Sequence, residues 1–275
     1  MLSSSRTGRL LGVGLLALAV TGCGGTSSQP AQQSTLDKVI ASGTLKVATI
    51  LTLPPFGMKD ASGNPEGFDV DVANALGKSL GVKVEITDVS GNDRIPFLTT
   101  SKVDVVVGAL TITPERAKTV AFTDHYVAAG AAILLAPKDS PYTNIQDVIN
   151  AGKSVSLAKG TTQDLALSAE YPSLQIQRFD TTAAALLAVK QGQAAALVED
   201  SNIVAYMAKQ DPTLKIVPNA ATGVEYYGIA CRHGDSDWYT YLNTWVEDFN
   251  DSGQNYATYQ KWFGVPPLLP LHPSV

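Results

Sequence analysis

Hydrophobic and polar positions along the chain follow two alternating periods. Short β-branched or apolar runs at 45–50, 82–87 and 103–108 are typical of strands. The segment 68–80, which lies among them, carries apolar residues at helical spacing and ends before a glycine. The run at 103–108 is nearly all apolar, as in strands buried on both faces of a parallel sheet. With a short helix expected at 95–100, this alternation predicts the α/β class.

The same alternation starts again after residue 130. We expect strands at 131–136, 154–157, 174–178, 194–198 and 215–217, with helices at 163–169, 182–191 and 202–209. The segments 238–250 and 256–263 are amphipathic helices with no strands of their own, so they must pack on an earlier unit. Two α/β units of about 100 residues each fit the length better than one continuous sheet.

The N-terminal segment has the pattern of an export signal. Two arginines precede an apolar run at 10–20, which is too short to span a bilayer because a spanning helix needs about 20 residues. We therefore expect a signal peptide at 1–22. The residues "VTGC" resemble the lipobox of bacterial lipoproteins and imply acylation of Cys23; an ordinary signal with a chance cysteine is the alternative. The polar segment 23–35 predicts a flexible linker.

Composition excludes several classes of function. The formal net charge of −5 argues on electrostatic grounds against nucleic acid as a partner. If Cys23 carries lipid, Cys231 remains the lone thiol, so no disulfide framework is expected. The sequence contains no HExxH, GxSxG, P-loop or CxxC motif and no EF-hand spacing, so we expect neither a metal nor a cofactor.

Arg116 stands at an unusual place for a cation. Thr113 suits a helix N-cap and Pro114 the first helical position, so Arg116 falls near the third position of a new helix. The N-terminal end of a helix carries the positive half of its dipole, where a cation is unfavourable by about 0.3–1 kcal/mol. A functional reason for this placement is therefore to be sought.

The strand before Arg116 supplies such a reason. Arg116 follows the strand at 103–108 across the loop 109–112, and ligands of open parallel sheets bind beyond the carboxyl ends of the strands. An anion there would satisfy the guanidinium and the free backbone N–H groups together. The alternative is a solvated surface arginine paired with Glu115 or Asp124.

Several stretches together resemble a known family. "EGFDVDVANALGKSLGVKVE", "IPFLTTSKVDVVVGALTITPERAKTVAFTDHY", "SVSLAKGTTQDLAL" and "ALVED" occur in the order and at the spacing of extracellular solute-binding proteins of polar amino acid ABC importers. The resemblance covers about 43–264. It implies a periplasmic-binding-protein-like fold, in which two α/β lobes are joined by two crossing strands and close like a trap on one small ligand. The crossings would lie at 127–130 and 223–227.

The resemblance also implies the domain organisation and the partners. Lobe 1 would comprise 36–127 and 225–275, including the C-terminal helices, and lobe 2 would comprise 131–221. The protein would be an exported, lipid-anchored monomer that faces the periplasm or the cell exterior and hands an amino acid to an ABC-type permease.

By the same resemblance, Arg116 binds the α-carboxylate of the ligand, and Asp200 at the end of "ALVED" binds its α-ammonium group. A helix N-cap is the alternative role for Asp200, since Ser201 and a helical segment follow it. The two roles are compatible. Further ligand-binding positions are expected at Ala109, Thr111, Thr161 and Thr162.

A third set of positions, compared with those of relatives in the same family, indicates the side chain of the ligand. Leu53 stands where many relatives place an aromatic ring, and Gly91 stands where a facing apolar residue is common, which weakens the case for a large aromatic ligand. Ile50 occupies the place of an acidic residue in many relatives that bind basic amino acids. Arg94 matches an arginine of glutamate- and aspartate-binding relatives; a surface arginine paired with Asp93 is the alternative. These residues favour glutamate, aspartate or a close analogue.

The expected function is ligand capture without chemistry. The alternative from another class is an enzyme that resembles cyclohexadienyl dehydratase on the same fold, with Glu199 or Asp200 as general acid. Neighbouring residues on a strand point to opposite faces, so Glu199 and Asp200 need not both enter the cleft. His125 has no nucleophile beside it and is interpreted as structural.

Overall fold

The computed structural model describes residues 33–130, 133–217 and 223–267, which belong to one compact unit. The predicted signal peptide 1–22 and the acylation site Cys23 lie outside these residues. So do Ala131 and Ala132 at the expected start of lobe 2 and residues 218–222 at its expected end.

The first lobe is built on a five-stranded sheet. Its strand order is β4-β1-β5-β12-β6. The strands are β1 (Thr44–Thr49), β4 (Lys83–Asp88), β5 (Val105–Val106), β6 (Val120–Gly130) and β12 (Val224–Arg232). β1 pairs in parallel with β4 and β5, whereas β12 runs antiparallel to both β5 and β6. The sheet is therefore mixed, where a parallel sheet was expected.

The second lobe repeats this plan. Its sheet has the order β11-β7-β10-β8-β9. The strands are β7 (Ile133–Pro137), β8 (Ser154–Ala158), β9 (Gln175–Phe179), β10 (Ala196–Glu199) and β11 (Leu214–Val217). β8 pairs in parallel with β9 and β10, and β7 runs antiparallel to β10 and β11. Together the two sheets confirm the predicted two-lobed α/β fold.

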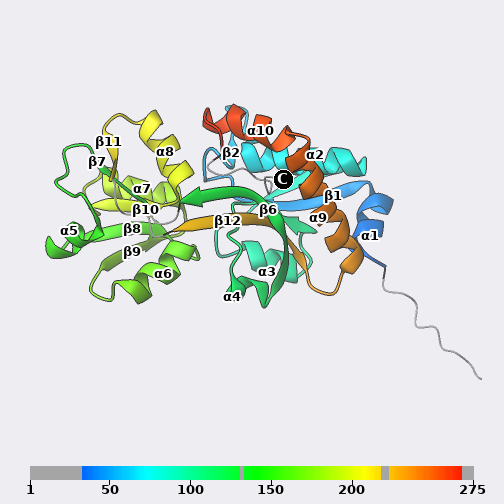
Figure 1. Cartoon of the computed structure of the whole chain (residues 1–275), viewed down its shortest axis with the longest axis horizontal. Coiled ribbons are helices and arrows are strands. Elements are labelled where there is room, and N and C mark those ends of the chain that lie inside the picture. Colours follow the sequence, from blue (N-terminus) through cyan, green and yellow to red (C-terminus); the bar gives the residue numbers. More distant parts are fainter. Residues whose placement is uncertain (1–32, 131–132, 218–222, 268–275) are drawn as a thin grey trace, which may run out of the picture. The chain divides into compact units, whose positions relative to one another are not determined.

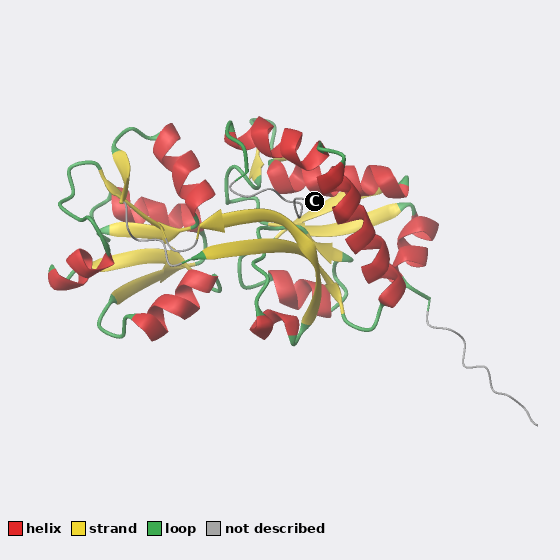
Figure 2. Ribbon diagram, in the orientation of Figure 1, coloured by secondary structure: helices red, strands yellow, loops and turns green. Residues whose placement is uncertain are grey.

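Helices flank both sheets, as Figures 1 and 2 show. Those of the first lobe are α1 (Thr35–Ser42), α2 (Phe68–Leu80), α3 (Arg94–Thr99), α4 (Pro114–Ala117), α9 (Ser236–Asp251) and α10 (Gln254–Phe263). Those of the second are α5 (Ile145–Asn150), α6 (Thr162–Glu170), α7 (Thr182–Lys190) and α8 (Ser201–Gln210). A small hairpin of β2 (Met58–Lys59) and β3 (Pro65–Glu66) precedes α2. The C-terminal helices pack on the first lobe, α9 against β6 and α10 against α2.

Two long strands connect the lobes. β6 and β12 pair antiparallel along their length, from Val224 opposite Gly130 to Arg232 opposite Val120. Along the chain, β6 is followed by β7 and β12 is preceded by β11, both strands of the second sheet. The ribbon formed by β6 and β12 is therefore the crossing predicted from the sequence (Figure 1).

The strand expected at 103–108 is shorter than predicted. Only Val105 and Val106 are regular strand, although Val107 still donates its N–H to Ala48 O at 3.1 Å. The chain then turns at Ala109, whose φ is +47°, a left-handed conformation that is unusual for a residue with a Cβ. This turn begins the loop that faces the second lobe.

The buried side chains of the two lobes meet. The ring of Tyr227 on β12 packs against Phe56 of the first lobe at 5.6 Å between centroids, and Ile203 and Met207 on α8 belong to the same apolar cluster. The two halves thus share one contiguous core beside the crossing. Within the described part of the chain, no helix is both long enough and apolar enough to span a membrane.

Candidate functional site

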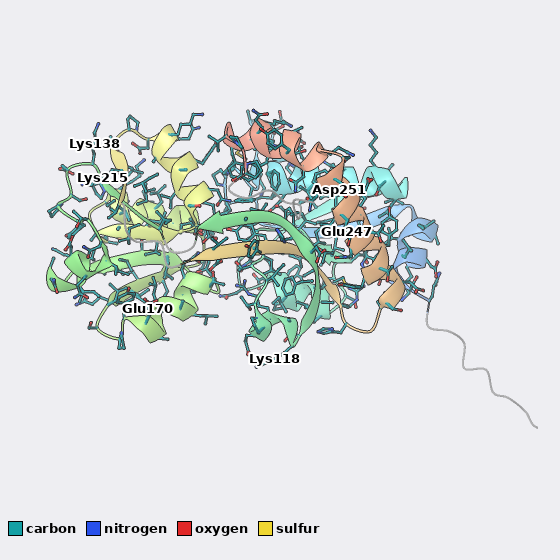
Figure 3. The ribbon with its side chains drawn as sticks, viewed as in Figure 1. Lys118, Lys138, Glu170, Lys215, Glu247 and Asp251 are labelled. Carbon is teal, nitrogen blue, oxygen red and sulfur yellow. The ribbon has the colours of Figure 1, made fainter. Side chains whose placement is uncertain are left out.

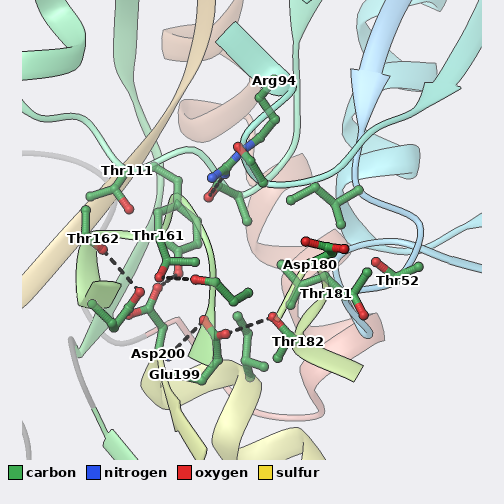
Figure 4. Close-up of a pocket in the computed structure, with 18 of the residues that line it drawn as sticks. Thr52, Arg94, Thr111, Thr161, Thr162, Asp180, Thr181, Thr182, Glu199 and Asp200 are labelled. Carbon is green, nitrogen blue, oxygen red and sulfur yellow. Dashed lines mark hydrogen bonds between the residues drawn. The ribbon is translucent and has the colours of Figure 1, made fainter. Parts of the chain in front are cut away.

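A cavity lies between the loops of the two lobes, next to the crossing strand β12. Figure 4 shows Arg94 on one side of it and Glu199 and Asp200 on the opposite side, with Thr111, Thr161 and Thr162 close together at the left. All the ligand-binding positions expected from the sequence line this cavity: Leu53, Gly91, Arg94, Ala109, Thr111, Arg116, Thr161, Thr162 and Asp200.

Arg116 reaches from the first lobe to the second. Its Nη1 donates to Thr111 O at 2.9 Å, and its Nη2 donates to Gly160 O, in the loop before α6, at 3.0 Å. The surface pairing with Glu115 or Asp124 considered as an alternative does not occur among the described residues, where Glu115 pairs with Lys118 and the bonds of the Arg116 guanidinium go to carbonyls. Burial lowers the pKa of the Arg116 guanidinium, and the nearby carboxylate of Glu225 opposes this shift. The guanidinium is thus a cation with donors still to spare at the cavity.

The local sequence places Arg116 as predicted. Thr113 Oγ1 accepts the N–H of Arg116 at 3.1 Å, and Arg116 is the third residue of α4. However, α4 is only four residues long, so its dipole is weak and opposes a cation less than the sequence argument supposed. The position of Arg116 is therefore fixed by the Thr113 cap and by its own two hydrogen bonds to carbonyls.

Backbone donors lie beside Arg116. Thr162 is the first residue of α6, so its N–H has no acceptor within the helix. Thr111 forms an isolated bridge with Tyr227 in which the bonds are made by the neighbouring residues Ile112 and Gly228, and no acceptor for its own N–H comes from the described residues. One such donor on each lobe can face a bound anion.

Asp200 closes the opposite side of the cavity. It follows β10 and stands at the N-cap of α8, but its side chain makes no capping hydrogen bond. Instead, Oδ1 accepts from Gln163 Nε2 at 2.5 Å, and Oδ2 accepts from the Tyr227 hydroxyl. Burial raises the pKa of Asp200 well above its usual range, and repulsion from Glu199 is the second-largest cause of this shift. A cation bound at Asp200 would relieve both penalties.

Arg94 is buried at the wall of the cavity, with 3% of its surface exposed. Its Nε donates to Gly91 O at 3.0 Å, and its Nη1 donates to Gly108 O at 2.9 Å and to Ala109 O at 2.8 Å. The alternative of a surface pair with Asp93 is wrong, because Asp93 accepts from Ser90. Burial lowers the pKa of Arg94 to about 10, so it stays charged at neutral pH. Its Nη2 makes no hydrogen bond with any described residue.

Comparison with known proteins shows which family the chain belongs to. The model of "Bacterial extracellular solute-binding proteins, family 3" matches residues 45–265. The chain belongs to this family. Its members are extracellular, and the relatives described next are amino acid-binding proteins, one of them named for an ABC transporter.

Two curated relatives and one solved structure illustrate the similarity. The glutamine-binding protein of Geobacillus stearothermophilus is 36% identical over 71% of this chain and 75% of its own length. The putative ABC transporter arginine-binding protein 2 of Escherichia coli is 31% identical over 81% of this chain and 92% of its own. The crystal structure of an ancestral amino acid-binding protein, described as a precursor of cyclohexadienyl dehydratase, has a TM-score of 0.77 and 37% identity over 84% of this chain and all of its own.

The "EGFDVDVA" stretch of this family member has a structural role at the site. Asp69, in the first turn of α2, accepts the N–H of Ala109 at 2.8 Å through Oδ2 and the Tyr126 hydroxyl at 2.8 Å through Oδ1. These bonds hold the left-handed turn at Ala109, whose carbonyl receives Arg94. Burial raises the pKa of Asp69 to about 7. Asp69 therefore supports the cavity wall from behind.

Glu199 also lines the cavity, although strand alternation allowed it to face away. β10 ends at this residue and the chain turns into α8, so the alternation of a regular strand no longer separates Glu199 from Asp200. Glu199 accepts from Thr182 Oγ1 at 3.0 Å, and burial raises its pKa to about 7.

Sequence reasoning missed Gln163 and Tyr227, the two residues whose side chains donate hydrogen bonds to Asp200. Gln163 follows directly after the predicted "KGTT" motif, and its polarity at a helix start was the available signal. Tyr227 lies in the segment 223–227 that was predicted to cross between the lobes, but nothing in its neighbourhood indicates that its hydroxyl meets Asp200. His125 is not among the residues lining the cavity; its ring contacts that of Tyr226 in a tilted arrangement, at 4.6 Å between ring centroids.

Proposed function

We propose that this family member captures a polar amino acid by closure of its two lobes and delivers it to an ABC-type permease. The observation that carries the proposal is that Arg116 of the first lobe and Asp200 of the second line one cavity. A ligand that contacts both would favour the closed arrangement by its greater affinity for that arrangement.

The two charges fit the two poles of an amino acid. A zwitterion removed from water needs a partner for each charge, because an unpaired buried charge costs several kcal/mol. Arg116 and the N–H groups of Thr111 and Thr162 would receive the α-carboxylate, and Asp200 would receive the α-ammonium group. Gln163 and Tyr227 already orient the Asp200 carboxylate, so little ordering would be needed on binding.

Arg94 indicates the class of ligand side chain. Its charged guanidinium lines the cavity with Nη2 uncommitted among the described residues, so a side-chain oxygen would be its complement. We propose glutamate or aspartate, with the amide glutamine as the close analogue that shares this oxygen. A basic side chain directed at Arg94 would instead meet a like charge.

The proposed cellular setting follows from the N-terminal pattern. Acylation of Cys23 would anchor an exported monomer to a membrane surface, since two or more acyl chains give stable attachment. Replacement of Cys23 by Ser should release the protein into the soluble fraction; retention in the membrane fraction would contradict the anchor.

Thermal-shift screening against the twenty amino acids tests the capture proposal. A ligand at 100 times its dissociation constant should add about 2.7 kcal/mol to the free energy of unfolding. Calorimetry then ranks the affinities for glutamate, glutamine and arginine. Asp200→Asn should lower the affinity for every amino acid that binds. An amino acid library that leaves the melting temperature unchanged would rule out the proposal.

One comparison makes the enzyme alternative worth a direct test. The structurally similar ancestral binding protein is described as a dehydratase precursor, and Glu199 has a pKa of about 7 in the cavity. We expect no product when the protein is incubated with prephenate or arogenate, because Asp200 and Arg116 suit the poles of an amino acid. Release of carbon dioxide above the uncatalysed rate would favour the enzyme.

A further inference from the structure

One oxygen of Glu225 receives hydrogen bonds from both lobes. Glu225 lies on β12, one of the two crossing strands. Its Oε2 accepts from Thr111 Oγ1 at 2.7 Å and from Thr162 Oγ1 at 2.8 Å. Thr111 belongs to the first-lobe loop between β5 and α4, and Thr162 begins α6 of the second lobe.

These bonds commit both hydroxyl groups. A threonine hydroxyl has a single proton, so neither Thr111 nor Thr162 can donate to Glu225 and to a second acceptor at once. The other acceptor within reach of Thr162 Oγ1 is Gln163 Oε1, which is farther away at 3.4 Å. The family resemblance made Thr111 an expected ligand-binding position. In this structure Glu225 occupies the hydroxyl of Thr111, and the backbone N–H groups and Arg116 remain for a ligand.

The bond pair depends on the closed arrangement. Thr111 and Thr162 are carried by different lobes, so rotation about the crossing strands would separate their hydroxyls. A single carboxylate oxygen can then keep at most one of them. Bonds to a charged acceptor are stronger than bonds between neutral groups, so this loss opposes opening.

Other contacts show how closely the lobes approach here. Arg116 of the first lobe donates to Gly160 O of the second, as described above. A Cβ at Gly91 of the first lobe would lie 3.0 Å from Lys159 O of the second. The Glu225 bonds thus lie within a tight contact between the two lobes.

We propose that Glu225 is a clasp, a positioning residue that holds the lobes together without any bound amino acid. This rests on the proposed function only in taking the lobes to open and close. Loss of the Glu225 charge should lower the ratio of closed to open molecules by about tenfold. The clasp would raise the closed population before a ligand arrives and so would set the affinity of the trap.

Small-angle scattering of the exported protein without amino acid tests the clasp. Glu225→Gln should increase the radius of gyration, and Thr162→Val, which removes the donor of the second lobe while leaving the Thr161 cap intact, should increase it as well. The double variant should show less than the sum of the two effects, because both remove the same link. Glu247→Gln is the control, since this glutamate is exposed on α9 far from the cavity (Figure 3).

The outcomes separate the clasp from the capture proposal. Wild-type scattering from both Glu225→Gln and Thr162→Val would overturn the clasp, and so would an effect of Glu225→Gln alone. Thermal melts check that each variant is folded. Amino acid screening of the wild-type protein tests capture, and its failure would leave the ligand-free scattering result interpretable.

Discussion

Replacement of Arg94 by Ala tests whether this arginine supports the cavity wall. The change removes three hydrogen bonds from a charged donor to the carbonyl oxygens of Gly91, Gly108 and Ala109. Each bond to a charged group contributes about 1.5–3 kcal/mol, and water entering the space would offset part of the loss. We therefore expect the free energy of unfolding to fall by about 3–5 kcal/mol.

Urea unfolding followed by circular dichroism measures this change. Thermal unfolding should show the same loss. At about 2–4 °C per kcal/mol for a domain of this size, the melting temperature of the Arg94→Ala variant should fall by roughly 10 °C. Arg178→Ala is the matched control. Its guanidinium bonds Asp164 and Ser168 at a site where 40% of the side chain is exposed, so its loss should cost under about 1 kcal/mol.

Two results would refute the reasoning. A loss below 1 kcal/mol for Arg94→Ala would mean that the three carbonyls need no cation. Equal losses for Arg94→Ala and Arg178→Ala would mean that burial of Arg94 has no energetic weight. Arg94→Ala also alters the cavity wall, so its effect on binding is measured as the difference between the affinity lost for glutamate and the affinity lost for glutamine. Glutamate should lose more affinity. Equal losses would remove the case for an acidic ligand.

Three further predictions concern neighbouring residues. Tyr227→Phe removes one hydrogen-bond donor from Asp200 and should weaken amino acid binding about tenfold in calorimetry. The side chain of Tyr226 is exposed, so Tyr226→Phe should leave the affinity unchanged. Asp69 has a pKa raised from 3.8 to about 7, so the stability that it contributes is complete below pH 4 and is lost as the pH rises through 7. The difference in unfolding free energy between wild type and Asp69→Asn should thus shrink over this range, and a pH-independent difference would contradict the assignment. Gly160→Ala places a Cβ against Asn92 of the facing lobe and should weaken ligand binding more than Gly152→Ala, because Gly152 also has a positive φ but has open space around it; equal effects would exclude a closure contact at Gly160.

The sequence was most informative where function depends on local pattern. Thr113 and Pro114 define the start of α4, and this places Arg116 without knowledge of the rest of the fold. Asp200 could be placed at the junction of a strand and a helix for the same reason. The two-period alternation likewise predicted both lobes, because each strand and helix forms within a few residues.

Long-range pairing was not predictable in this way. Glu225 is 114 residues from Thr111 and 63 from Thr162 along the chain, so no local pattern links the three side chains. Arg94 was expected to point at a ligand, but its Nη1 binds two carbonyls of the loop at Gly108 and Ala109, which Asp69 holds through the N–H of Ala109. These roles follow from tertiary contacts that leave no periodic signal.

The apolar cluster shared by the two lobes has a calorimetric consequence. Moving the lobes apart would expose parts of Ile203, Met207 and Tyr227 to water, although the ligand itself is polar. Binding that brings the lobes together should therefore show a negative heat-capacity change larger than a small zwitterion alone can produce. Titrations at several temperatures would thus report how much hydrocarbon surface the motion removes from solvent.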